Sequence, residues 1–353
     1  MNRRRWPLLV SCLFLCGFGT CKQYLASQQE ADRRADEMQK ECDAMKNRVI
    51  SFEEEQSFGG AVSVNWVSRG GGLTTHRDAH ALHVQLNKIG KNLAAQSSRP
   101  TLPWTFGVLQ SEGVNAVSGP GGYVFVSEGL LAQLDNEAQL AGVLAHEIAH
   151  ITGKHALHEY QDYLLSECEG AVRAERASAL KETASQAVAE GARQVKKGVG
   201  SEVQELSRML AIPELRDAFT KLGSQMEGFK FDDLSKEFIQ AITNGFVARI
   251  TEKGFRQEDE FAADTEAVEL MAAAGYAPEE YVAFLSKLPD SGLSTAHPSK
   301  QKRQSRLTEH LKKLRKSATD DEFTTSVDLS QTKVVPLRDT LQSRRTGTTA
   351  HSN

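Results

Sequence analysis

The spacing of apolar residues predicts helices over most of the chain and a small number of short strands. One helix with a single buried face is predicted over 79–93. Its apolar stripe consists of Leu82, Leu86, Ile89 and Leu93. Residues 105–109 and 122–126 are short apolar runs beside Gly and Pro, a pattern typical of strands, and the turn-prone segment 118–121 directly precedes the second run.

A second buried helix is predicted over 137–153. Asp135 or Asn136 can cap its start, and Glu137 lies where a carboxylate favours the positive end of the helix dipole. The apolar stripe of this helix consists of Leu140, Val143, Leu144 and Ile151. We therefore expect most of it to be buried.

The C-terminal half of the chain lacks strand patterns. Residues 156–250 are rich in alanine, and we expect several helices there, broken at Gly191, Gly198, Gly200 and Pro213. Further helices are predicted over 260–274 and 278–287. The predicted fold class is α+β, predominantly helical, with a small sheet.

The first twenty residues have the pattern of an export signal. Three arginines precede the apolar run 8–18, which is shorter than the roughly 20 residues that span a bilayer. Cys21 follows a segment that loosely resembles a bacterial lipobox, in which the cysteine is acylated. Lipidation of Cys21, cleavage nearby and an uncleaved anchor stay open. Each predicts an exported, periplasmic chain, and the first adds membrane association through lipid.

This pattern divides the chain into four parts. An export signal over 1–20 is followed by a polar helical spacer over 21–52. The main domain covers 53–310 and includes an expanded helical insertion over 156–250. A flexible, Ser/Thr-rich tail is expected over 311–353.

Composition and charge exclude several classes of protein. Apolar residues make up 40 % and charged residues 25 %, which is typical of a chain that folds in water. The net charge of −4 becomes more negative once the signal arginines are removed, so no nucleic-acid partner is expected. Cys42 and Cys168 lie outside the signal and could pair in an oxidising compartment. Their spacing matches no metal motif, and two separate thiols are the favoured interpretation.

The string His146-Glu147-Ile148-Ala149-His150 carries the chemistry. Inside a helix, the i, i+4 spacing puts both imidazoles on one face, where they can hold one Zn²⁺ per chain. Glu147 projects beside that face, so its carboxylate can act as a general base without binding the metal. Two buried histidines with no metal would leave ring nitrogens to satisfy in a dry interior.

A catalytic zinc site of this kind needs a third protein ligand and one open position. Glu260 is the candidate for that ligand. Asp264 lies one helical turn later on the same face and can support a ligating histidine. The small Ala262 and Ala263 allow the two helices to approach closely.

These motifs together resemble the HtpX-like and CAAX-prenyl-protease-like zinc metallopeptidases, in particular their exported BepA-like branch. The resemblance covers roughly 53–306, and its landmarks are 114–123, 146–150, 260–264, 274–276 and 296–299 with Arg303. It implies a gluzincin-type zincin fold in which Glu260 completes the zinc site and Asp264 supports it. It also implies a polypeptide substrate.

The resemblance further implies that strand 122–126 is the edge strand along which the substrate lies in the active-site cleft. A peptide added to a sheet edge is held through its backbone, which allows a broad choice of sequence. The expected substrate contacts are Asn115, Gly121, Gly122, Tyr123 and Val124; Asn115 is alternatively a plain turn residue. Residues 117–119 depart from the family pattern of an aromatic and two apolar residues.

By the same resemblance, His297 and Arg303 return over the cleft. A donor or cation near the metal would stabilise the oxyanion that forms on the scissile carbonyl. Alternatively, His297 binds the open metal position and keeps the enzyme latent, or both are ordinary surface residues. His155 and His158 are expected at the surface rather than as ligands, because the preceding helix ends near Gly153.

Two functions fit these observations. The first is a zinc metalloendopeptidase (EC 3.4.24 type) of the cell envelope that degrades misfolded or stalled envelope and outer-membrane proteins. The second is a non-catalytic, metal-binding chaperone or assembly factor on the same fold. The intact Glu147 favours catalysis, because a structural zinc site has four protein ligands and no use for a base. The insertion over 156–250 either acts as a lid or enlarges the helical shell.

Overall fold

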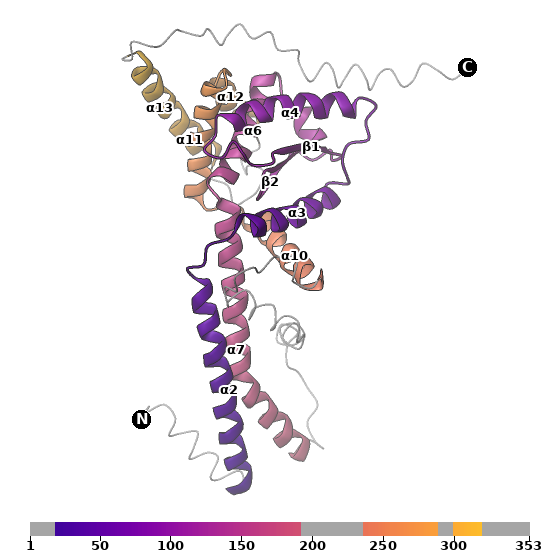
Figure 1. The fold of residues 1–353 in the computed structure, drawn as a ribbon, viewed down its shortest axis with the longest axis vertical. Helices are drawn as coiled ribbons and strands as arrows, with labels where there is room; N and C mark the ends of the chain where they lie inside the picture. The colour runs from indigo at the N-terminus through magenta and orange to yellow at the C-terminus, as the bar shows by residue number, and fades with distance from the viewer. Residues whose placement is uncertain (1–17, 192–235, 289–298, 320–353) are drawn as a thin grey trace, which may run out of the picture. The chain divides into compact units, whose positions relative to one another are not determined.

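The computed structural model describes residues 18–191, 236–288 and 299–319 (Figure 1). Its strands are β1 (Thr105–Leu109), β2 (Ala116–Gly119) and β3 (Tyr123–Ser127). Its helices are α2 (Phe18–Met45), α3 (Phe52–Arg69), α4 (Ala79–Ala95), α5 (Glu128–Leu131), α6 (Glu137–Thr152), α7 (His155–Gly191), α10 (Lys236–Lys253), α11 (Gln257–Ala273), α12 (Glu279–Lys287) and α13 (Lys300–Thr319). The fold is α+β and predominantly helical, as predicted. Within the described ranges, no helix combines the length and apolar character needed to cross a bilayer.

The chain forms two compact units. The first takes its described residues from Met1–Val49 and Gln161–Phe238, and the second from Ile50–Tyr160 and Ile239–Asn353. Helix α7 begins in the second unit and continues into the first.

In the first unit, α2 and α7 pair in antiparallel directions. Cys42 forms a disulfide with Cys168, and further toward the start of α2 Arg34 forms an ion pair of 2.6 Å with Glu175. The favoured interpretation of two separate thiols is therefore wrong: the cysteines are 126 positions apart, and only the pairing of the two helices brings them together. Within the polar spacer predicted over 21–52, the helix ends at Met45 and is not solvated all round. Its buried residues are Ala31, Ala35, Cys42 and Met45.

The second unit contains the sheet, whose strand order is β1-β3-β2. β1 and β3 are parallel, with Thr105 opposite Tyr123, whereas β2 runs antiparallel to β3, with Val117 opposite Phe125. The strands predicted over 105–109 and 122–126 are both present. However, β3 is paired on both sides, so the prediction that it forms the sheet edge is wrong. The edge beside α6 is β2, which the sequence analysis missed.

Helices cover this sheet on both sides; in Figure 1, α4 lies above the strands and α3 below them. The stripe predicted for α4 is buried, with Leu86 and Leu93 at 2 % and 0 % exposure. Helix α4 approaches β1 closely at Gly90, where a Cβ would lie 2.5 Å from the Phe106 ring. Only glycine fits there, because the interior is close-packed.

Helix α6 is the central element of this unit and contacts α4, α11, α12 and β2. The side chain of Asn136 caps its start by accepting a hydrogen bond from the backbone N–H of Gln139 at 2.9 Å. Residues 138–151 are all buried, as the apolar stripe predicts. The helix ends at Gly153.

The C-terminal half differs in detail from the prediction. Helix α7 is unbroken from His155 to Gly191, the first position at which a break was predicted, and α10 is a second helix of the region where several were expected. The breaks predicted at Gly198, Gly200 and Pro213 lie outside the described residues. Helix α13 continues to Thr319, so the start of the predicted tail at 311 is still helical.

We predict that the disulfide stabilises the first unit. Replacing both Cys42 and Cys168 with alanine is expected to lower the free energy of unfolding by about 2–4 kcal/mol, because the unfolded chain loses a cross-link. Denaturant unfolding with and without reductant measures the effect. Reductant should destabilise the wild type and leave the double variant unchanged. Alkylation of both cysteines in unreduced, denatured wild type would contradict the pairing.

Candidate metal centre

Two imidazoles on α6 face the same point. His146 and His150 are 7 % and 2 % exposed, and their Nε2 atoms lie 3.1 Å apart. The i, i+4 spacing inside one helix turn produces this arrangement. Each histidine therefore presents Nε2 to the shared centre and has Nδ1 directed elsewhere.

Helix α11 supplies the third side chain. Glu260 is fully buried in its first turn, with carboxylate oxygens 3.7 Å from Nε2 of His146 and 3.6 Å from Nε2 of His150. Ala263, expected to allow a close approach of α11 to α6, is 0 % exposed, as is Ala267. Ala262, expected in the same role, is exposed.

The three side chains fit a tetrahedral metal ion. Their ligand atoms all lie within 4.8 Å of one another, and in the described part of the chain this is the one such group of three. Ligands about 2.0–2.1 Å from a tetrahedral zinc lie about 3.3–3.4 Å apart. The two Nε2 atoms are 3.1 Å apart, and Glu260 places Oε1 3.6 Å from Nε2 of His150 and Oε2 3.7 Å from Nε2 of His146. Two imidazoles, one carboxylate and an open side form the ligand set of catalytic zinc.

Asp264 contacts the His146 imidazole on the side of its Nδ1 atom. Its Oδ1 lies 3.1 Å from Nδ1 of His146 and also accepts a hydrogen bond of 2.9 Å from the Tyr281 hydroxyl. Burial raises the pKa of Asp264, but the charge and hydrogen bonds of Arg303 lower it by more, so the pKa lies well below its ordinary value. Asp264 is therefore an anion in the folded protein and fixes the orientation of the His146 ring.

Arg303 forms a buried ion pair with that carboxylate. Its Nε and Nη2 donate to the two oxygens of Asp264 at 2.8 and 2.6 Å, and Nη2 also donates to Tyr281 at 2.8 Å. The side chain lines the cavity but is only 5 % exposed. Its positive charge compensates the negative charge of Asp264. The role expected from the sequence was instead to stabilise the oxyanion. His297 lies outside the described residues.

The expectation for His155 is wrong, because it is buried at 6 % exposure beside the centre. Gly153 ends α6, Lys154 adopts a left-handed φ of 56°, and the turn folds His155 back so that its Nδ1 lies 2.9 Å from Nδ1 of His150. The Phe255 ring stacks on His150 with ring centroids 4.4 Å apart. The adjacent Gly153 and Lys154 were the available sequence signal for the turn that returns His155 to His150. His158 is exposed, as expected.

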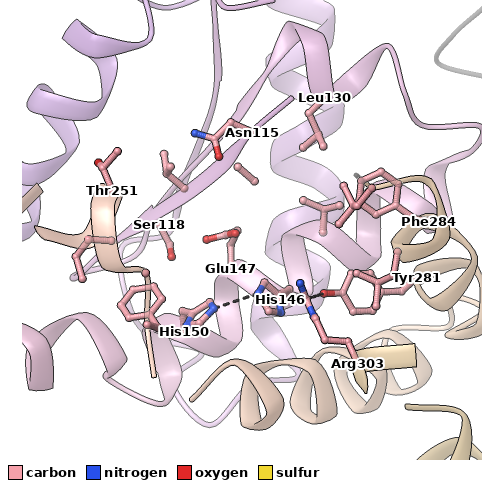
Figure 2. A pocket seen from close by; sticks show the side chains of 18 of the residues that line it. Asn115, Ser118, Leu130, His146, Glu147, His150, Thr251, Tyr281, Phe284 and Arg303 are labelled. Atoms are coloured by element: carbon pink, nitrogen blue, oxygen red, sulfur yellow. Dashed lines mark hydrogen bonds between the residues drawn. The ribbon is translucent and has the colours of Figure 1, made fainter. Parts of the chain in front are cut away.

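A cavity opens in front of these ligands (Figure 2). The cavity is partly open to solvent, and with that open part counted its volume is about 950 Å³. Glu147 is 8 % exposed, and its carboxylate is directed into the cavity beside both histidines. Strand β2 with Asn115 forms one wall. An apolar part of the wall consists of Leu130, Val143, Phe284, Leu285 and Leu288.

Four of the expected substrate contacts do not line this cavity. Gly121, Gly122 and Val124 are buried and Tyr123 is half-buried, outside the cavity wall. The two glycines have φ of 81° and 101°, and Gly121 donates its N–H to Glu55 on α3 at 3.0 Å. These glycines form the turn between β2 and β3. Asn115 does line the cavity.

Comparison with known proteins agrees with this geometry. Residues 81–311, more than half of the chain, match the profile of Peptidase family M48. The chain belongs to Peptidase family M48. The resemblance drawn from its motifs is thereby confirmed, and M48 peptidases are zinc-dependent metallopeptidases.

Relatives of this M48 peptidase share a short stretch with it. The beta-barrel assembly-enhancing protease of Escherichia coli K12 is 34 % identical over 77 residues, which cover 22 % of this chain and 16 % of that protein. The Yersinia pestis protein of the same name is 37 % identical over 79 residues, with the same coverage. The mitochondrial metalloendopeptidase OMA1 of Schizosaccharomyces pombe is 38 % identical over 77 residues, covering 22 % and 23 %. The matched stretch thus spans less than a quarter of each relative.

We predict that Arg303 is essential to the stability of the M48 domain. Arg303→Gln leaves the buried, ionised Asp264 without its charged partner, and the free energy of unfolding is expected to fall by about 3–5 kcal/mol. Arg306→Gln is the matched control, because Arg306 is exposed on the same helix and stacks 4.2 Å from the centre of the Phe261 ring. That variant should lose less than about 1 kcal/mol. Equal losses in denaturant unfolding would contradict this role.

Proposed function

We propose that this M48 peptidase is a zinc-dependent endopeptidase of the cell envelope. One observation carries the proposal: Glu147 projects from the metal helix into an open cavity, beside both imidazoles. A carboxylate in that position can accept a proton, which a purely structural metal site does not require. His146, His150 and Glu260 would hold the ion.

The catalytic roles follow from these positions. When bound, zinc supplies Lewis-acid activation of water and of the scissile carbonyl. Glu147 takes a proton from the attacking water and passes it to the leaving amine as the carbon–nitrogen bond breaks. Asp264 keeps His146 oriented throughout. His297 remains a prediction for stabilising the oxyanion or for gating the metal.

The edge strand β2 supports binding of an extended polypeptide. Ser127 donates its backbone N–H to the carbonyl of Asn115 at 2.9 Å, and pairs alternate along an antiparallel ladder. The backbone groups of Ala116 and Ser118 therefore point away from β3, at the open edge. A peptide added there would place side chains in the apolar part of the cavity. Such pairing holds the peptide through its backbone and does not require binding of its termini, which favours an endopeptidase.

Three observations support the envelope as its location. The first twenty residues have the export pattern, the disulfide is typical of an oxidising compartment, and two relatives are named for enhancing beta-barrel assembly. We accordingly propose misfolded or stalled outer-membrane proteins as substrates. Anchoring through a lipid on Cys21 remains part of the proposal.

The proposed activity predicts a separation between catalysis and metal binding. Glu147→Gln is expected to reduce casein digestion by at least about 100-fold, because the general base is lost, while bound zinc is unchanged. A chelator should abolish wild-type digestion, and added zinc should restore it. Glu137→Gln, at the start of the same helix, is the control and should retain activity. Equal, chelator-insensitive digestion by wild type and Glu147→Gln would favour a non-catalytic chaperone or assembly factor.

The edge-strand proposal predicts an effect of proline on substrate binding. Ser118→Pro removes an outward N–H without removing a donor to β3, so KM for an unfolded protein substrate should rise several-fold with zinc content unchanged. Ser118→Ala keeps the N–H and should resemble wild type. If Ser118→Pro had a wild-type KM and thermal stability, substrate binding along β2 would be wrong.

A further inference from the structure

The two histidines of the metal helix are supported by different groups. Behind His146 lies a carboxylate, Asp264, whereas Nδ1 of His150 lies 2.9 Å from Nδ1 of His155. His150 presents Nε2 to Glu260 and His146. An imidazole that binds a metal through Nε2 carries its proton on Nδ1. His150 therefore donates to His155, whose Nδ1 accepts.

The acceptor ring is held in a fixed orientation. His155 is 6 % exposed, and a Cβ on Gly153 would lie 2.5 Å from its Nε2, so the ring packs directly on this glycine. With Nδ1 accepting, the proton of His155 is on Nε2, which faces Oδ1 of Asp259 at 3.8 Å. Ring packing on one side and a carboxylate on the other favour the tautomer that accepts from His150.

We propose that His155 is a positioning residue for the metal centre: it accepts the Nδ1 proton of His150 and thereby orients Nε2 toward the ion. This inference rests on the proposed zinc site and adds a residue that the HExxH motif does not contain. The role depends on an accepting atom at the position of Nδ1, not on the bulk of the ring. That distinction makes the proposal testable.

Two substitutions at this position separate hydrogen bonding from packing. His155→Phe keeps a buried ring but removes the acceptor, whereas His155→Asn loses ring volume but retains an oxygen near the position of Nδ1. The zinc dissociation constant of the purified chain, measured by competition with a chelator, should rise about 10- to 100-fold in His155→Phe. His155→Asn should recover most of that loss. A side chain needed only for packing predicts the reverse order.

Gly153→Ala provides an independent test. Gly153 has φ of −71°, which alanine adopts without strain, and the nearest atoms to an added Cβ are Nε2, Cε1 and Cδ2 of the His155 ring. The substitution should therefore weaken zinc binding in the wild type by displacing that ring. In the His155→Asn background those ring atoms are absent, so Gly153→Ala should have almost no further effect. Additive effects in this double-mutant cycle would overturn the proposal.

Controls distinguish failure of this inference from failure of the proposed function. His158→Phe, exposed on the same helix, should bind zinc as wild type does. Thermal unfolding of the metal-free variants shows whether each one folds. If wild type binds zinc and His155→Phe binds it equally well, the positioning role is wrong and the metal site stands. If wild type binds no zinc, both are wrong.

Discussion

The packing of α11 against α6 is the contact on which the site depends. It brings the fully buried carboxylate of Glu260 within 3.7 Å of two imidazole nitrogens. Hiding a carboxylate from water is costly unless a positive charge compensates it. A divalent cation between these three side chains would supply that charge. Burial of Glu260 and the chemistry of the three ligands therefore both favour a bound metal ion. Ala263 and Ala267 of α11 are fully buried, and their small side chains favour a close approach of neighbouring helices.

A second buried charge fixes the geometry of this pair of helices. Asp264 joins α11 to α6 through His146, to α12 through Tyr281 and to α13 through Arg303. Such a network requires every member to be satisfied, because the interior has a low dielectric. Helix α13, in the C-terminal part of the region that matches the family, is thereby connected to the metal ligands. The orientation of one imidazole consequently depends on residues far along the chain.

The sequence predicted what is local and missed what depends on long-range pairing. The i, i+4 spacing of His146 and His150 defines a site within one helix, and apolar periodicity placed most helices correctly. The edge strand β2 was missed because it is short and contains turn-forming Ser118 and Gly119; only pairing with β3 makes it a strand. His155 was placed at the surface because no periodicity reports the tight turn that returns it to His150.

These features together imply that a single zinc ion binds between α6 and α11, in front of an open cavity. Anomalous diffraction from crystals of the zinc-loaded chain, collected on both sides of the zinc absorption edge, tests it most directly. We expect one peak per chain, about 2.0–2.2 Å from Nε2 of His146, Nε2 of His150 and a carboxylate oxygen of Glu260. A peak bound by other residues, or no peak between these three, would contradict it.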